Sequence, residues 1–312
     1  METVRRSLRE RRYSRRTEEA YVYWIRRFIE FHGRVHPAQL GDGEVAAFLS
    51  WLAVEERVAA STQKQATAAL VLLYDRVVGR TLHLSGVAPA RSGTIVPTVL
   101  SEREVRALFR ELSAIPRLCA EIMYGSGLRV TECVALRVKD IDFDRLTIVV
   151  RAGKGQKDRR TPLGERCADE LRRHLTRVRE QYDGDLRRGV RTTLLDGALS
   201  RKYPGADRDW RWRYVFGASR TFVDGAGVRR RHHLDATVLQ RAVPAAALRA
   251  ELTKRVTCHT LRHSFATHLL ESGVDIRRLQ VVFGHTDVRT TMRYTHVEGR
   301  GGAGVRSPAD RL

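Results

Sequence analysis

Asparagine is absent from this chain of 312 residues, and lysine is scarce. Arginine supplies nearly all of the positive charge, and lysine occurs at only six positions: Lys64, Lys139, Lys154, Lys157, Lys202 and Lys254. A GC-rich genome explains this bias. Each lysine therefore marks a position that arginine did not take over, and a lysine inside a motif is a candidate for chemistry that arginine cannot perform.

Cysteine is also scarce, and its four positions lie far apart without a CxxC pair: Cys119, Cys133, Cys167 and Cys258. A chain of this length needs no disulfide framework, so we expect free thiols in a reducing compartment. No second ligand pair with zinc spacing accompanies Cys258 and its neighbouring histidines, which argues against a zinc site. Long apolar runs and a signal peptide are absent, which predicts a cytoplasmic protein without a membrane span.

Positive charge is what the chain has in excess. Lysine and arginine number 57 against 36 aspartate and glutamate, for a formal net charge of +21. Such a field attracts polyanions, so nucleic acid is the first expected partner and an anionic membrane surface the second. The hydrophobic fraction of 42% is typical of a folded chain with a core.

Helical periodicity predicts a small basic helical domain over residues 1–92. Apolar residues recur at helical spacing over 17–31, 43–54 and 61–78, and Gly33 and Gly79 end the first and third of these helices. Glycine and proline are frequent between residues 85 and 97, which indicates a linker. We therefore place a second domain over 97–312.

The second domain is predicted to be α+β, with a small antiparallel sheet, in a chain that is mainly α. Ser101 and Glu104 form a capping-box pair that starts a helix. Residues 146–151 and 159–162 are predicted as paired strands around a glycine-rich turn, and helices are predicted at 164–181, 259–271, 276–282 and 287–294. The helical pattern resumes at residue 234 but is interrupted by Pro244. Residues 183–231 are interpreted as an insertion.

Two segments offer arginine to an anion. Arg129 follows a pair of glycines in GLRVTE, where a helix is expected to start. In the segment HTLRH, His259 and Arg262 are three residues apart and so share one helix face. This pair can present a cation and a proton-transfer group to one phosphate. We interpret His263 and His268 as hydrogen-bonded packing residues.

Three further positions could carry chemistry. Lys154 lies in the glycine-rich turn GKGQK and, unlike arginine, can act as a general acid near neutral pH. The alternative is simple phosphate binding by a glycine turn, although no Walker pattern is present. His285 precedes Thr286, a plausible N-cap, and Tyr294 follows nine residues later. Taken alone, a tyrosine at such a position is usually structural.

The order Arg129, Lys154, His259-x-x-Arg262, His285, Tyr294 resembles the tyrosine recombinase family. The most specific part is HTLRHSFATHLLESG, followed by GH and a tyrosine, and the resemblance covers both domains. It implies that Tyr294 attacks the scissile phosphate, forming a 3′-phosphotyrosyl link and freeing a 5′-hydroxyl. It implies no metal, ATP or other cofactor, because the covalent link conserves the energy of the phosphodiester.

The same resemblance implies the roles of the other five residues. Arg129 and Arg262 would hold the non-bridging oxygens and stabilise the charged transition state. His259 and His285 would complete this set, with His259 taking the tyrosine proton. Lys154 would protonate the leaving 5′-oxygen.

The insertion resembles that of integron integrases, at segments including DWRW and the pair His232-His233. This likeness implies that Trp210, Trp212, His232 and His233 recognise bases flipped out of a folded single-stranded cassette site. Such side chains can stack on an exposed base, but they could also form a structural cluster. Asp196 and Pro244 depart from the subfamily pattern.

The sequence thus predicts a recombinase that inserts and excises gene cassettes at integron attachment sites. Its expected partners are duplex attachment sites, the folded single-stranded cassette site and three further copies of itself. Three alternatives stay open: a recombinase for duplex sites of the phage integrase or chromosome dimer resolvase type, a non-catalytic DNA-binding relative, and a topoisomerase-like relaxing enzyme.

Overall fold

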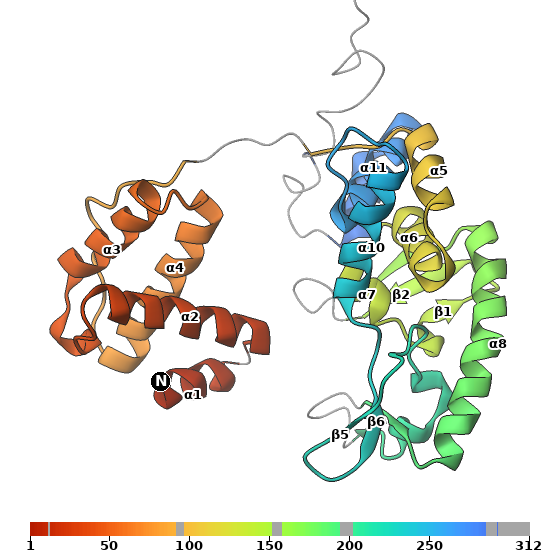
Figure 1. The fold of residues 1–312 in the computed structure, drawn as a ribbon, viewed down its shortest axis with the longest axis horizontal. Helices are drawn as coiled ribbons and strands as arrows, with labels where there is room; N and C mark the ends of the chain where they lie inside the picture. The colour runs from red at the N-terminus through yellow and green to blue at the C-terminus, as the bar shows by residue number, and fades with distance from the viewer. Residues whose placement is uncertain (12, 92–96, 152–157, 194–201, 285–291, 293–312) are drawn as a thin grey trace, which may run out of the picture. The chain divides into compact units, whose positions relative to one another are not determined.

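A computed structural model describes residues 1–11, 13–91, 97–151, 158–193, 202–284 and 292. The chain divides into two compact units, Met1–Ile95 and Val96–Leu312 (Figure 1). Both are built mainly from helices, and the second also contains small sheets, which confirms the predicted fold class. No helix within the described residues is both long and apolar enough to cross a membrane.

The described residues of the first unit form four α-helices: α1 (Glu2–Glu10), α2 (Arg15–Phe31), α3 (Asp42–Val54) and α4 (Ala60–Leu73). A short 3-10 helix (Pro37–Gln39) precedes α3, and a π-helical turn (Tyr74–Val78) extends α4. Phe28, Phe48 and Tyr74 are fully buried at its centre, with the Phe28 and Phe48 rings edge to face at 5.5 Å. The helices predicted at 17–31, 43–54 and 61–78 are confirmed, and Gly79 ends the last with φ +79°.

Helix α1 was not predicted, because its sequence is polar and rich in arginine. Two apolar residues one turn apart, Val4 and Leu8, are buried against the unit's core. Arg5 and Arg9 donate to the buried carboxylate of Glu18 on α2, at 2.8 and 2.9 Å. The helix is therefore fixed by two apolar anchors and by ion pairs to a neighbouring helix, which a local pattern does not reveal.

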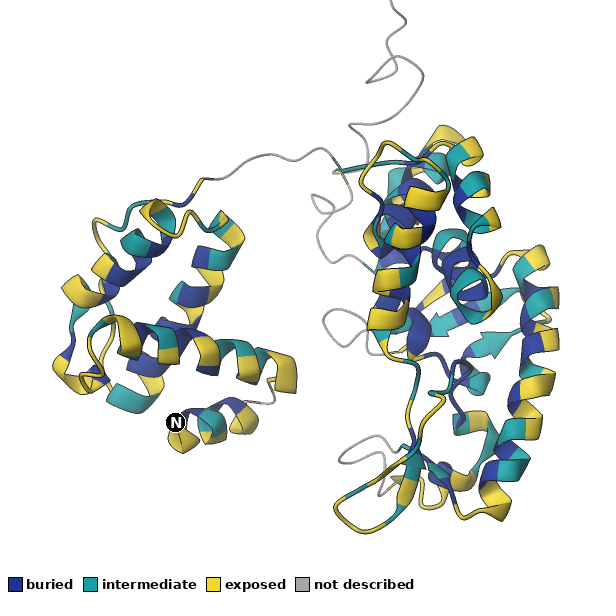
Figure 2. Cartoon of the chain, viewed as in Figure 1, coloured by how far each residue is buried: buried dark blue, intermediate teal, exposed yellow. Residues whose placement is uncertain are grey.

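The second unit is organised around α6 (Ala114–Ser126). The longest helices that pack against it are α8 (Glu165–Arg187), α10 (Ala236–Arg249) and α11 (Cys258–Glu271). The described part of this unit also contains the shorter helices α5 (Glu102–Arg110), α7 (Val130–Val134) and α12 (Ile276–Phe283), and α5 and α7 contact α6 too. Buried residues are frequent along both α6 and α11 (Figure 2). The predicted capping box of Ser101 and Glu104 is present at the start of α5.

The predicted antiparallel sheet is confirmed and contains one more strand than expected. Its order is β1 (Ile141–Asp142), β2 (Thr147–Val150) and β3 (Arg159–Pro162), with Ile148 opposite Thr161. Residues alternate between buried and exposed along β3, so Arg159 and Thr161 face inward. Three 3-10 turns lie in this unit as well: Val138–Asp140, Ala206–Arg208 and Trp210–Trp212.

A second sheet, which was not predicted, lies in the insertion. It has the order β4 (Arg191–Thr192), β6 (Arg229–Arg231), β5 (Phe222–Val223), with β4 parallel to β6. Asp185 anchors it from α8, accepting from Arg231 at 2.6 and 2.8 Å and from Arg213 at 2.5 Å. Burial raises the pKa of Asp185, but these arginines outweigh that effect and lower it to about 2.

Two helix limits differ from the sequence prediction. Helix α8 continues beyond Gln181 to Arg187, because Tyr182 and Asp185 are buried, so the first residues assigned to the insertion are helical. Helix α10 runs without a break through Pro244. The proline removes one hydrogen bond from the helix, but Val243, Ala246 and Ala247 are buried in the core and keep the helix in place.

Candidate active site

Arg262 is held deep inside the second unit, where α6, α11 and α12 meet. The side chain is nearly fully buried, with Leu261 and Phe265 as buried neighbours on α11. Its Nη1 atom donates to the carbonyl of Gly127, and its guanidinium carbon lies 4.0 Å from the centre of the Phe283 ring. The guanidinium is thus fixed by both a hydrogen bond and a cation–π contact.

Gly127 makes this arrangement possible. It ends α6 in the left-handed region, with φ +62°, and a Cβ atom there would lie 2.5 Å from Phe265 and 2.6 Å from Phe283. The chain therefore turns where a side chain has no room and a positive φ is required. Two residues later Arg129 is the N-cap of α7, which confirms the predicted helix start.

Replacing Gly127 by alanine is expected to destabilise the second unit by about 2–5 kcal/mol. The change adds the cost of a left-handed alanine, about 1–2 kcal/mol, to that of overpacking, about 1–3 kcal/mol. Urea unfolding measures the loss. Gly273→Ala is the matched control, because its φ is +84° but nothing lies within 4 Å of a Cβ there. Equal losses for the two variants would contradict the packing argument.

Glu132 connects the arginines of the site. Its carboxylate accepts from Arg129 Nη1 at 2.7 Å and from the Arg129 backbone nitrogen at 2.8 Å. Arg159 donates to both oxygens, at 2.9 and 2.7 Å, and Arg262 Nη1 lies 3.8 Å away. Burial raises the pKa of Glu132, yet the hydrogen bonds from Arg159 and Arg129 dominate and lower it to about 2. One permanent negative charge therefore faces three arginines, which leaves a net positive site for an anion.

His259 lies one turn before Arg262 on α11, near its N-terminus, and is exposed. Partial burial of the ring and the nearby charges of Arg262 and Arg129 lower its pKa. The imidazole is therefore neutral near pH 7 and can accept a proton. The structure thus brings together three of the predicted site residues: Arg129, His259 and Arg262.

The other three predicted catalytic residues, Lys154, His285 and Tyr294, lie outside the described residues. The described segments that follow Lys154 and precede His285 meet at Arg159, which also contacts the Glu132 carboxylate. Arg159 starts β3, five residues after Lys154, and its Nε atom donates to the carbonyl of Val282 in the last turn of α12 at 3.0 Å. Gly284, which directly precedes His285, ends α12 with φ +62°.

Three of the four predicted base-contacting residues share one cluster around Arg137 and Tyr214. The Arg137 guanidinium lies 4.2 Å from the Tyr214 ring and 5.6 Å from the Trp212 ring. The Tyr214 ring is 5.5 Å from His232 and 5.2 Å from His233, and the two histidine rings are 3.9 Å apart. Partial burial and the neighbouring His233 and Arg137 lower the pKa of His232 to about 4.

The two tryptophans of this set are partly exposed and point to different partners. One face of Trp212 is covered by Lys139, whose Nζ atom lies 2.8 Å from the ring centre. Burial lowers the pKa of Lys139 to about 8. Trp210 lies instead against α8, 5.3 Å from Tyr182 and 5.1 Å from the Arg179 guanidinium. Each tryptophan therefore already has partners within the unit.

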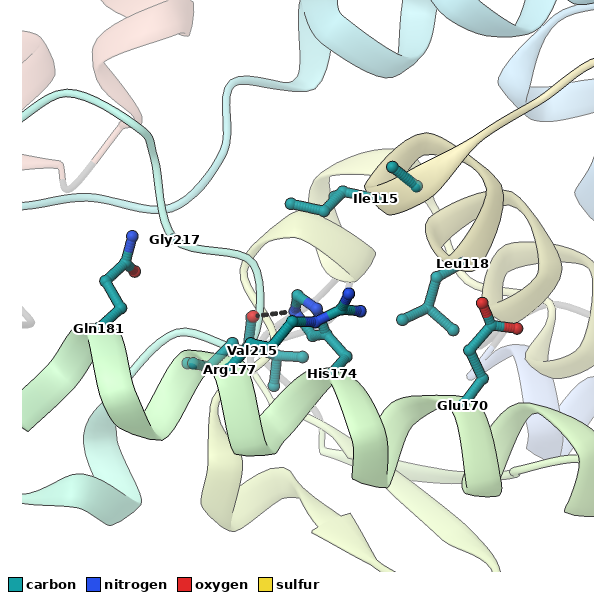
Figure 3. A pocket seen from close by; sticks show the side chains of 10 residues that line it. Ile115, Leu118, Glu170, His174, Arg177, Gln181, Val215 and Gly217 are labelled. Carbon is teal, nitrogen blue, oxygen red and sulfur yellow. Dashed lines mark hydrogen bonds between the residues drawn. The ribbon is translucent and has the colours of Figure 1, made fainter.

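A cavity of about 330 Å³ lies apart from these residues, between α6, α8 and the segment around Val215 (Figure 3). His174 is buried in its wall, with Nε2 2.8 Å from the Val215 carbonyl. Arg129, His259 and Arg262 do not line it.

On α11, the Nδ1 atom of His268 is 2.8 Å from the Tyr124 hydroxyl, which confirms the interpretation of His268 as a hydrogen-bonded packing residue.

Sequence reasoning assigned no role to Glu132 or Arg159. A signal for Glu132 was available, since it lies three residues after Arg129, at the capping-box position where a carboxylate can reach back to the helix start. Arg159 gave a weaker signal, as an arginine at an inward position of a predicted strand. Its contacts cross 27 residues to Glu132 and 123 to Val282, a separation that no local pattern encodes.

Comparison with known proteins covers both units. Residues 98–300 match the Phage integrase family, and residues 1–84 match the Phage integrase, N-terminal SAM-like domain. An Integrase/recombinase of Escherichia coli is 48% identical, over 100% of this chain and 93% of the relative. Tyrosine recombinase XerA of Thermococcus kodakarensis is 32% identical, over 90% and 84% respectively.

Solved structures share the fold. The XerH site-specific recombinase bound to palindromic difH substrate has a TM-score of 0.63 at 20% identity, covering 91% of this chain and 77% of its own. The Tn1549 transposon integrase in complex with transposon right end DNA has a TM-score of 0.62 at 17% identity, covering 99% and 96%.

Proposed function

Because this chain is a tyrosine recombinase of the phage integrase family, an enzyme that cuts and rejoins DNA, we propose that it acts on integrons, inserting and excising gene cassettes. The observation that supports the site assignment best is the group of Arg129, Arg262 and His259 around Glu132. It offers a fixed positive charge for a phosphate and a neutral imidazole beside it.

In the proposed reaction, the Tyr294 oxygen attacks the scissile phosphorus and the bond to the 5′-oxygen breaks. His259 takes the phenolic proton, and Lys154 gives a proton to the leaving 5′-oxygen. Arg129, Arg262 and His285 stabilise the charge on the non-bridging oxygens. The 5′-hydroxyl of a second strand then attacks the phosphotyrosine, and the proton transfers run in reverse. No cofactor enters, since one phosphoester bond is formed for each that is broken.

The integron assignment is supported by the insertion. Trp210 and Trp212 lie on one 3-10 turn and stay partly exposed. His232, which shares the cluster around Arg137 and Tyr214 with Trp212, is exposed. We propose that these side chains and His233 contact flipped-out bases of a folded cassette strand. The Escherichia coli relative matches the whole chain, the insertion included.

We also propose that DNA is the partner of both units and that four protomers assemble on two sites. Two of the structural relatives are complexes with DNA, namely XerH with difH substrate and the Tn1549 integrase with transposon end DNA. The net charge of +21 fits this partner. A recombinase for duplex sites is the second candidate, favoured by the 32% identity to XerA over 90% of the chain.

Covalent trapping tests the proposal. The substrate is the labelled, folded bottom strand of a cassette attachment site with a nick beside the cleavage point, so that cleavage releases a short fragment and strands the protein on DNA. The linear duplex of the same sequence runs in parallel. We expect a protein–DNA adduct on the folded strand and little on the duplex.

The three other outcomes have different meanings. An adduct only on the duplex would keep the recombinase chemistry and replace the integron assignment by the duplex-site candidate. Relaxation of a supercoiled plasmid that lacks any site would indicate a topoisomerase-like enzyme. Tight binding without an adduct on this site and on a second attachment site would contradict the proposed cleavage.

A further inference from the structure

Arg159 is a buried arginine at the start of β3 whose guanidinium makes contacts on two sides. Nη1 and Nη2 donate to the two oxygens of Glu132, at 2.9 and 2.7 Å. Nε donates to the carbonyl of Val282 at 3.0 Å. The planar fork therefore ties β3 to α7 and to the last turn of α12 with one side chain.

The same carboxylate is shared with Arg129 and Arg262. Arg129 Nη1 lies 2.7 Å from one oxygen of Glu132, and Arg262 Nη1 lies 3.8 Å from the other. Without Arg159, the described partners of the buried carboxylate would be the side chains of these two arginines and the Arg129 backbone nitrogen. Their donors would then be drawn to Glu132 and away from a phosphate. Arg159 satisfies the carboxylate from the side of β3 and prevents this.

We propose that Arg159 is a positioning residue for strand cleavage: it holds Glu132 so that Arg129 and Arg262 keep their donors for the scissile phosphate. The inference rests on the proposed roles of Arg129 and Arg262, and Arg159 acts through Glu132. The fit around it is close, since a Cβ atom on Gly284 would lie 2.9 Å from Arg159 Cδ. Arg159→Lys keeps the positive charge but cannot reproduce this geometry, because a lysine has no planar fork of donors.

A purely structural ion pair makes a different prediction. If Arg159 only stabilised the fold, its loss would slow the cleavage of every substrate equally. If it frees the phosphate-binding arginines, the loss depends on the charge of the phosphate. A methylphosphonate at the scissile position carries no negative charge and needs less help from arginine.

The test is single-turnover cleavage by Arg159→Lys of two versions of the nicked site, one with a normal phosphate and one with a methylphosphonate. We expect cleavage of the phosphate to be about 10- to 100-fold slower and cleavage of the methylphosphonate to change by less than about 3-fold. Arg160→Lys is the matched control, because Arg160 is the exposed neighbour on the same strand. It should leave both rates unchanged.

Equal slowing on both substrates, or no slowing, would overturn the inference. Should Arg159→Lys fail to fold, Arg159→Gln is compared in the Glu132→Gln background. If Arg159 acts only through Glu132, the double variant should cleave the phosphate less than about 2-fold more slowly than Glu132→Gln alone. A further loss as large as that of a single variant would overturn the inference as well.

Arg129→Gln separates this inference from the proposed function. If Arg129→Gln slows cleavage of the phosphate no more than cleavage of the methylphosphonate, the proposed role of Arg129 is wrong. The proposed role of Arg159, which rests on it, is then wrong as well. If Arg129→Gln shows the phosphate-specific loss and Arg159→Lys does not, only the role of Arg159 is wrong.

Discussion

Tyr294→Phe is expected to give no covalent adduct on any DNA substrate, a loss of at least about 10⁴-fold in the cleavage rate. Phenylalanine keeps the ring and removes the one oxygen that can attack phosphorus. Binding to DNA should stay within about 3-fold, because the charges that attract the backbone are unchanged. Single-turnover trapping on the nicked site measures the first quantity, and a shift of the labelled DNA in a gel measures the second.

Tyr124→Phe is the matched control for this change. It also removes one phenolic hydroxyl, which lies 2.8 Å from His268, and should cost about 1 kcal/mol of stability while leaving the adduct intact. An adduct that persists in Tyr294→Phe would show that another residue is the nucleophile. An adduct lost in both variants would point to a folding defect instead.

The fold was predictable from the sequence where the hydrophobic periodicity agrees with the residues that begin or end a helix or strand. Residues 259–271 carry both a helical pattern and a following serine–glycine stop, and α11 begins and ends within one residue of that prediction. The strand at 159–162 was predicted at its full length because a glycine-rich turn separates it from a β-branched partner. Helix α1 and the β4–β6–β5 sheet were missed, since ion pairs to distant residues hold both in place.

The site was predictable in its residue types but not in its connections. Arg129 and the His259–Arg262 pair could be identified from their segments, because glycine spacing and helix periodicity are local. Glu132 contacts Arg129, Arg159 and Arg262 because α7, β3 and α11 pack together. This packing could not be predicted from local sequence patterns. The insertion shows the same limit, since its aromatic residues were found but their partners Arg137 and Lys139 were not.

Arg262→Gln is expected to lower the single-turnover cleavage rate by about 10²–10³-fold, equivalent to about 3–4 kcal/mol of transition-state stabilisation. Glutamine removes the positive charge from a buried position between the Gly127 carbonyl and the Phe283 ring. Arg262→Lys should recover less than about a tenth of the lost rate. A lysine keeps the charge but cannot hold the carbonyl and present two donors to a phosphate at once.

The control for Arg262 is Arg173→Gln, an equal change of charge at an exposed position of α8. It should leave the rate within about 2-fold, since a surface charge away from the site adds only a screened contribution.

The pH dependence of the cleavage rate supplies a second check. Because the charges of Arg262 and Arg129 help to keep the pKa of His259 low, Arg262→Gln should move the acidic limb of the rate profile to higher pH. A rate within 3-fold of the unmodified protein, or an unmoved acidic limb, would contradict the proposal that Arg262 acts on the phosphate beside a neutral His259.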